Sequence, residues 1–239
     1  MWLQACLNGS RTATEHPAAP LTPAALAADA RRVLEAGASA VHLHPRDQAG
    51  RESLALDVVS ATLTAIREAC PGLAVGISTA ASIEPDLSRR LAAIDAWTVL
   101  PDFVSVNLSE TGIEQVLAVL VRRGVGLEAG IWTAEDAQYL LTLTDVPWLR
   151  LMLEPWDSDP EQANTIVDAI EDVLGGALSH VPCLIHGTDG AVWALLERAK
   201  RGGHLSRVGL EDTLLLPTGE PAPNNAALVR AAMALTSLR

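Results

Sequence analysis

Eight short apolar segments recur along the chain, and longer stretches in which apolar residues follow a helical spacing separate them. Strands that alternate with helices in this way pair in parallel. The expected strands cover approximately residues 2–7, 39–44, 73–78, 102–107, 125–131, 148–153, 181–186 and 205–210. Eight such units in 239 residues predict an α/β fold, a (β/α)8 TIM barrel that occupies residues 1–239 as a single domain.

The helix-like stretches carry their own start and stop signals. In residues 22–37, Thr22 is placed to cap the helix, Pro23 suits its first position and Gly37 ends it. Residues 56–70 and 164–176 are further examples of the pattern. An open, doubly wound sheet is the alternative fold, but the first strand-to-helix turn, LNGSRTATEHPAAP, lacks the glycine fingerprint of a dinucleotide-binding fold.

Charge and cysteine content narrow the classes of function. A formal net charge of -12 argues against nucleic-acid partners, because a negative surface repels phosphate backbones. Three widely spaced cysteines, Cys6, Cys70 and Cys183, indicate buried free thiols in a reducing compartment. The first ten residues do not resemble a signal peptide, and no apolar run approaches about 18 residues. We therefore expect a cytoplasmic protein without a membrane span.

The second expected strand ends in His42-Leu43-His44. Because side chains alternate faces along a strand, His42 and His44 point the same way and can offer two nitrogen ligands to one metal ion. The strand stops at once in Pro45, Arg46 and Asp47, which places the pair at the carboxyl end of the barrel, where active sites lie. Two buried core histidines are the alternative interpretation.

Polar residues also stand at the other strand ends, including Ser78, Asn107, Glu128, Glu154 and His186. Along the eighth strand and just beyond it, Arg207, Gly209 and Glu211 share a face at a spacing of two, so Glu211 is expected to complete a site with the two histidines. Two histidines and one carboxylate with an open position are typical of a catalytic metal site. Zinc suits these ligands, and iron(II) remains open.

Several motifs resemble a known family. AVHLHPRD (40–47), GISTA (76–80), VSVN (104–107), RVGLEDT (207–213) and TGEPAPNNAALVRAA (218–232) are similar to segments of the β-keto acid cleavage enzymes. The resemblance spans nearly the whole chain. It implies a zinc-dependent (β/α)8 barrel that transfers CoA from acetyl-CoA to part of a β-keto acid and releases acetoacetate. It also implies a homo-oligomer, a dimer or a tetramer.

Carried over position by position, the resemblance implies roles for individual residues. His42, His44 and Glu211 would bind zinc, and Asp212 would be the general base, oriented or tuned by Arg207. The expected substrate contacts are Ser78, Thr79, Ser105, Asn107, Arg11 and Glu128. For Glu128, an inward carboxylate paired with a neighbouring arginine is an equally open alternative.

The chain departs from the family pattern at three places. Arg11 stands where the amine-specific member has an acidic residue, which favours a substrate with an anionic or neutral distal end, such as 3-oxoadipate. Ala80 and Ala81 replace glycines that often follow the third strand. The segment LEPWDSDPEQ (153–162) replaces a glycine-rich loop after the sixth strand, so the CoA contacts are expected to differ.

Other classes of function stay open at this point. Metal-dependent amidohydrolases also use His-x-His on a barrel strand, but on the first strand, where this chain has no histidine. A Schiff-base aldolase requires a lysine at a strand end, and the single lysine, Lys200, is far from one. A non-catalytic barrel that binds a small molecule is the third alternative.

Overall fold

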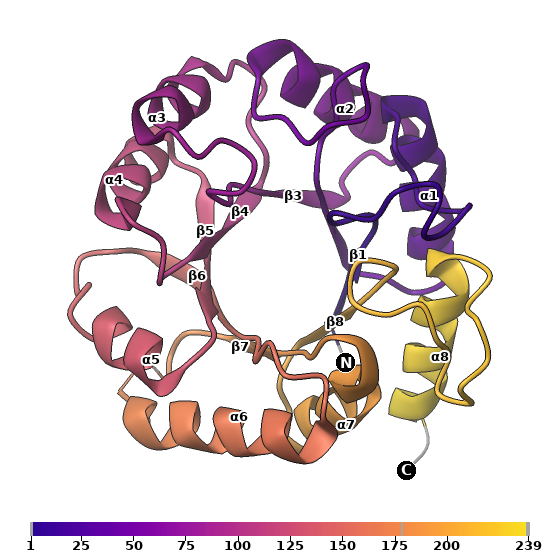
Figure 1. Ribbon diagram of the computed structural model, residues 1–239, viewed down its shortest axis with the longest axis vertical. Coiled ribbons are helices and arrows are strands. Elements are labelled where there is room, and N and C mark those ends of the chain that lie inside the picture. The colour runs from indigo at the N-terminus through magenta and orange to yellow at the C-terminus, as the bar shows by residue number, and fades with distance from the viewer. Residues whose placement is uncertain (1, 178, 238–239) are drawn as a thin grey trace.

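Eight parallel strands form one sheet in the computed structural model, which describes residues 2–177 and 179–237 (Figure 1). Their order is β7-β6-β5-β4-β3-β2-β1-β8. The sheet curls into a nearly closed barrel. Its two edges meet where Leu184 of β7 forms a parallel bridge with Leu205, just before β8. The strands are β1 Leu3–Cys6, β2 Ala40–Leu43, β3 Ala74–Ser78, β4 Phe103–Asn107, β5 Gly126–Ile131, β6 Trp148–Leu153, β7 Cys183–Ile185 and β8 Ser206–Val208.

A helix follows each strand and lies on the outside of the ring, so that α8 ends beside α1 (Figure 1). A short 3-10 helix, Asp189–Ala191, precedes α7. The helices are α1 Pro23–Glu35, α2 Leu56–Ala69, α3 Leu87–Ala96, α4 Ile113–Arg123, α5 Ala134–Leu140, α6 Pro160–Leu174, α7 Val192–Gly202 and α8 Asn225–Ser237. The predicted TIM barrel is therefore confirmed.

The local signals explain where the elements begin. The Thr22 side chain accepts a hydrogen bond from the Ala25 main-chain N–H, and Pro23 takes the first helical position of α1, as expected. Helix α1 ends at Glu35, two residues before Gly37, whose φ of 110° turns the chain into β2. All four residues of β1 and of β2 are buried, as in parallel sheets that helices cover.

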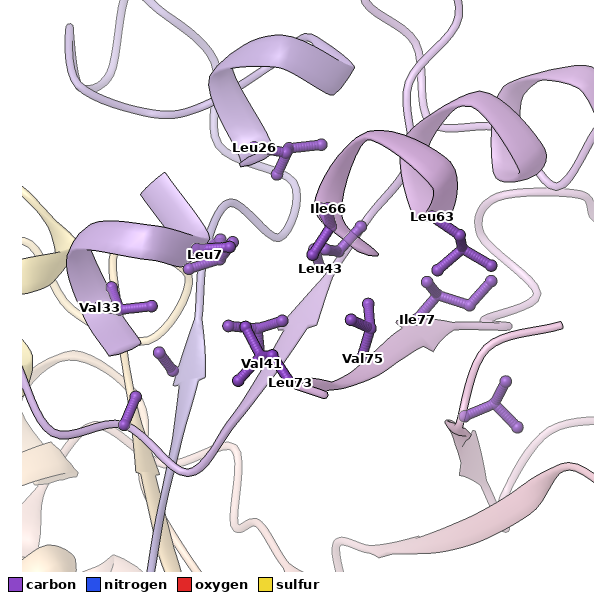
Figure 2. Close-up of a cluster of buried hydrophobic side chains, with 14 of the residues drawn as sticks. Leu7, Leu26, Val33, Val41, Leu43, Leu63, Ile66, Leu73, Val75 and Ile77 are labelled. Atoms are coloured by element: carbon purple, nitrogen blue, oxygen red, sulfur yellow. The ribbon is translucent and has the colours of Figure 1, made fainter. Parts of the chain in front are cut away.

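The largest part of the hydrophobic core lies between the barrel wall and the surrounding helices. Figure 2 shows Val41, Leu43, Val75 and Ile77 of the wall among leucine, isoleucine and valine side chains of α1 and α2. The labelled helical residues are Leu26, Val33, Leu63 and Ile66, and each is fully buried. This packing fixes the strands, and the strands in turn fix the loops at their carboxyl ends.

All three cysteines are free. Cys6 and Cys70 are buried, and Cys183 is half-buried. Burial raises the pKa of the Cys183 thiol to about 12 and also raises the pKa of Cys6, so both thiols stay protonated near neutral pH. Among the described residues, no helix is long and apolar enough to cross a membrane.

The chain just after β8 passes close to the backbone of β1 at Gly209. A Cβ at this position would overlap main-chain atoms of Cys6, although the backbone conformation of Gly209 is open to other residues. Glycine is therefore required at position 209, because the Cys6 backbone leaves no room for a side chain.

We expect Gly209→Ala to lower the free energy of unfolding by about 1 to 3 kcal/mol, because the two strands must separate to admit the methyl group. Urea denaturation of both proteins measures the difference. Gly202→Ala, in the last turn of α7, is the matched control, since its Cβ would meet only the movable imidazole of His204. Equal stability of the two variants would contradict the steric account.

Candidate active site

A cavity of about 570 Å³ opens at the carboxyl ends of the strands. Side chains from the end of every strand, or from the loop that follows it, line this cavity. The charged and imidazole-bearing lining residues are Arg11, His42, His44, Glu52, Glu110, Glu154, His186, Asp189, Arg207, Glu211 and Asp212. Titratable side chains concentrated in one cavity of a barrel indicate an active site.

His42, His44 and Glu211 converge at one side of the cavity. One ligand atom from each lies within 4.8 Å of the other two. The His42 Nε2 atom is 3.8 Å from Glu211 Oε1, and the His44 Nε2 atom is 3.9 Å from Glu211 Oε2. Glu211 Oε2 is buried and has no hydrogen-bond partner within the described parts of the chain. This donor set fits a divalent metal ion with an open coordination position.

Two residues fix His44, which lies just beyond β2. The Asn8 side chain, after β1, donates to the His44 carbonyl at 2.9 Å and accepts from the His44 main-chain N–H at 2.9 Å. Glu52 Oε2 is 2.6 Å from His44 Nδ1. A carboxylate on one ring nitrogen orients the ring, so the Nε2 atom is left for a metal.

Glu211 lies in a turn, and its side chain reaches the two histidines from there. The sequence predicted instead that the strand would continue through residue 210. Strand β8 ends at Val208, and the main-chain N–H of Asp212 donates to the Gly209 carbonyl in the turn that follows. The Glu211 side chain crosses the space that a Cβ on Gly9 would occupy. The carboxylate is thus where the sequence predicted, but the turn and Gly9 put it there rather than strand alternation.

Arg207 holds both carboxylates that follow β8. Its Nη2 atom is 2.5 Å from Glu211 Oε1 and 2.5 Å from Asp212 Oδ1, and its Nε–H donates to Asp212 Oδ1 at 3.1 Å. Asp212 Oδ2 is buried and lacks a partner in residues 2–177 and 179–237. One oxygen of Asp212 is therefore anchored by Arg207, and the other is not engaged by the described residues.

The environment sets the protonation of these groups. Burial lowers the pKa of His42 to about 3, so its ring is neutral at pH 7, the form that binds metals. Burial alone would raise the pKa of Glu211, but the Arg207 guanidinium and the two imidazoles lower it below its usual value. Burial raises the pKa of Asp212 more than Arg207 lowers it.

The structure brings some predicted substrate contacts to the cavity and places two elsewhere. Ser78, Ser105 and Asn107 line it. Thr79 is buried outside the lining, because its hydroxyl donates to the Ser105 carbonyl at 2.8 Å. Glu128 is also outside the lining and completely buried.

Glu128 follows the second interpretation considered for it, the inward carboxylate with an arginine partner. Arg150 Nε donates to it at 2.7 Å, and Gln4 Nε2 donates to it at 3.1 Å. The expectation that Glu128 contacts substrate is corrected accordingly, since its oxygens are engaged within the barrel.

Arg11 lines the cavity, but its guanidinium already has partners. The Nε–H donates to the Leu210 carbonyl at 3.1 Å, and the two terminal nitrogens lie 3.5 Å from Glu15 and 3.4 Å from Asp189. Two carboxylates thus offset one positive charge. The expectation that the distal end of the substrate is anionic or neutral stays a prediction.

Three groups of cavity residues were not assigned from the sequence. Glu52 lies eight residues after His44 and returns to it because residues 46 and 52 pair in a small antiparallel bridge. Glu154 and His186 were expected at strand ends, with a role at the site left open for His186, and the structure joins them at 2.9 Å. Trp132 and Trp156 stack edge to face, with ring centroids 5.3 Å apart, and line the same side of the cavity.

Comparison with known families agrees with this arrangement. Residues 1–238 match the family described as beta-keto acid cleavage enzyme. The chain belongs to this family. By its description, this is a family of enzymes that act on β-keto acids. It is also the family that the sequence motifs resemble.

Two proteins that carry the name of an enzyme of this kind are similar to the chain over most of their length. A 3-keto-5-aminohexanoate cleavage enzyme from Fusobacterium nucleatum is 28% identical over 247 residues, which cover 95% of this chain and 88% of the relative. The enzyme of the same name from Acetoanaerobium sticklandii is 26% identical over 250 residues, with the same coverage.

Solved structures support the barrel fold. ObcA in a binary complex with oxaloacetate has a TM-score of 0.72 and 18% sequence identity, and the match covers 91% of this chain. This chain spans only 63% of the ObcA chain. A 3-dehydroquinate dehydratase from Geobacillus kaustophilus has a TM-score of 0.66 and 11% identity, with 99% of this chain covered and 90% of the other.

We expect one divalent metal ion per chain, and His44→Ala to lose it, because two ligands are too few for stable binding in this geometry. Elemental analysis of the purified proteins measures the metal. Glu52→Gln should weaken affinity about 10- to 100-fold, since it leaves the ligand atoms in place and only loosens the His44 ring. His180→Ala, an exposed histidine, is the control. Full metal content in His44→Ala would show that the ion binds elsewhere.

Proposed function

We propose that this chain cleaves a β-keto acid with acetyl-CoA as co-substrate, and yields acetoacetate and a new acyl-CoA. The observation that carries the proposal is the position of Asp212. Asp212, whose Oδ2 atom has no partner among the described residues, lines the same cavity as the ligand set of His42, His44 and Glu211, so a base and a metal site are available to one substrate. The named activity of the Fusobacterium relative and the ObcA complex with a C4-CoA adduct and oxalate support it.

The proposed metal is zinc, because two imidazoles and one carboxylate are a usual catalytic zinc set. Zinc bound there would act as a Lewis acid toward the ketone and carboxylate oxygens of a β-keto acid and would make its C2 protons more acidic. Glu52 holds the His44 ring in the orientation that this requires.

Asp212 is the proposed general base. Its Oδ2 atom accepts the C2 proton, while Arg207 anchors the Oδ1 atom and keeps the carboxylate in one orientation. The raised pKa of Asp212 makes it a stronger base than an exposed aspartate. Ser78, Ser105 and Asn107 supply polar contacts that hold the substrate in the cavity.

Two steps follow, and each of them forms one bond and breaks another. The C2 carbanion attacks the acetyl carbonyl of acetyl-CoA, a carbon–carbon bond forms, and the CoA thiolate leaves. The thiolate adds to the C3 carbonyl of the original substrate, and the C2–C3 bond breaks. This step releases the new acyl-CoA and leaves the electron pair on C2 of the acetoacetate fragment. Asp212 returns the proton to that carbon, so the base is regenerated without net consumption of water.

Asp212→Asn is expected to lower kcat by at least about a hundredfold, because the amide cannot accept the C2 proton. The assay follows acetoacetate formation from a panel of β-keto acids in the presence of acetyl-CoA. Elemental analysis of the same preparation should show wild-type metal content, since Glu211 is intact. Near-normal turnover by Asp212→Asn would refute the base. Cleavage that does not need acetyl-CoA would refute the co-substrate and favour a hydrolase.

A further inference from the structure

The wall of the cavity at β3 and β4 is polar. Ser78 of β3 lies beside Ser105 of β4, and Asn107 follows two positions later on the same face of β4. All three residues line the cavity. In the barrel, β3 separates β4 from β2, and the candidate metal ligands belong to the ends of β2 and β8. Asn107 therefore lies on a part of the wall that is separate from the ligand set.

One side-chain contact sets the orientation of the Asn107 amide. Its Nδ2–H group donates to the Oε1 atom of Glu110, in the loop after β4, at 2.8 Å. The Glu110 carboxylate is in an ion pair and can only accept, so the amide turns its N–H group toward Glu110 and its Oδ1 atom away. In the part of the chain that the structure describes, no group donates to this Oδ1 atom. The oxygen is left as an acceptor for a ligand.

Glu110 is itself held from helix α3. Arg90 of this helix lies 2.6 Å from Glu110 Oε2 and also donates to the Thr111 carbonyl at 3.3 Å. The Arg90 side chain is buried, and the Glu110 side chain is only 14% exposed. Separating a buried ion pair is strongly unfavourable, because each charge is left without its partner and without water. The carboxylate is therefore fixed in one orientation.

Glu110 also joins the loops that follow β3 and β4. The Ala81 main-chain N–H, in the loop after β3, donates to Glu110 Oε1 at 2.9 Å. This oxygen thus accepts from both Ala81 and Asn107, which uses its two lone pairs, while Arg90 binds the other oxygen. The contacts of Glu110 are therefore made within the protein, and they leave the Asn107 Oδ1 atom as the acceptor that it directs to the ligand.

The reacting end of a β-keto acid has no donor for this acceptor, because its ketone and its carboxylate only accept hydrogen bonds. Acetyl-CoA is different. The arm that leads to its thioester contains amide groups, and each amide N–H donates. One of these amides is joined to the thioester sulfur by a short methylene link, so it enters the site together with the reacting carbon. Of the two proposed substrates, acetyl-CoA is thus the one that complements Asn107 near the point of reaction.

We propose that the Asn107 Oδ1 atom accepts a hydrogen bond from the acetyl-CoA amide nearest to the thioester, and that Glu110 is the positioning residue that aims it. The inference rests on the proposed function for the identity of the co-substrate. It assigns the wall at β3 and β4 to the CoA arm, whereas the β-keto acid binds at the ligand set of His42, His44 and Glu211. The two substrates then approach each other from different sides of the cavity.

An analogue of acetyl-CoA in which an ester oxygen replaces that N–H group tests the hydrogen bond. Wild-type kcat/KM for acetyl-CoA should exceed the value for the analogue by about tenfold, because the ester oxygen faces another acceptor. Asn107→Leu should bring this amide-to-ester ratio to about one, since leucine has a similar shape and cannot accept. A wild-type ratio near one, or a ratio that survives in Asn107→Leu, would overturn the assignment.

Glu110→Gln tests the positioning role with the same amide-to-ester ratio. A glutamine has one acceptor oxygen for the donors of Arg90 and Ala81, so its amide nitrogen meets a donor whichever way it turns. The ratio should fall several-fold, and Glu110→Gln should not change it further when added to Asn107→Leu. The matched control is Asp95→Asn, which also separates a carboxylate from an arginine but outside the cavity, and which should keep the wild-type ratio. A wild-type ratio in Glu110→Gln, or an equal fall in both variants, would overturn the positioning role.

Calorimetric titration separates this inference from the proposed function. The probes are S-ethyl-CoA, a thioether that cannot transfer an acetyl group, and its ester analogue with the same N–H group replaced. Tighter binding of S-ethyl-CoA by about tenfold, lost in Asn107→Leu, supports the inference even if no acetoacetate forms. Equal affinities, or no binding of either probe, overturn the inference even if acetoacetate does form.

Discussion

The close packing of β1 between β2 and β8 is the constraint on which the site depends. Its register sets Cys6 beside His42 and Gln4 beside Arg207, so the candidate metal ligands at the end of β2 and in the turn after β8 meet across the end of β1. Gly209 lets β8 approach the Cys6 backbone, and Gly9 leaves room for the Glu211 side chain. A side chain on Gly9 would overlap the Glu211 side chain, and one on Gly209 would overlap the Cys6 backbone, so either change would displace the turn or the side chain that brings Glu211 to the histidines.

Charge balance is the second condition. Arg207 is buried with Glu211 and Asp212, and leaving either carboxylate buried without it would cost several kcal/mol. Arg207 does not pair with every carboxylate oxygen. Glu211 Oε2 and Asp212 Oδ2 remain without hydrogen-bond partners in the described chain. Unpaired buried oxygens lower stability. In the function proposed above, a metal ion and a substrate proton supply the missing interactions.

The sequence predicted the barrel and the convergence of His42, His44 and Glu211, because periodicity and strand-end chemistry are local signals. The turn that carries Glu211 was not predicted. A continued strand would put the Glu211 side chain in the same place, so the side-chain pattern does not distinguish the strand from the turn. Glu52, Glu110 and the Trp132–Trp156 pair depend on loop conformations that bring distant residues together. Glu128 faces inward and pairs with Arg150 on the adjacent strand β6 and with Gln4 on β1 across the barrel, which spacing along one strand does not reveal.

The central claim is that the carboxyl ends of β2 and β8 hold one catalytic metal ion. Anomalous diffraction at the zinc edge, from crystals of the zinc-loaded protein, tests it most directly. The account predicts one peak per chain, bonded to the Nε2 atoms of His42 and His44 and to the Glu211 carboxylate at about 2.0 to 2.2 Å. A fully loaded protein with no peak at these three residues, or with its peak on a different ligand set, would contradict the account.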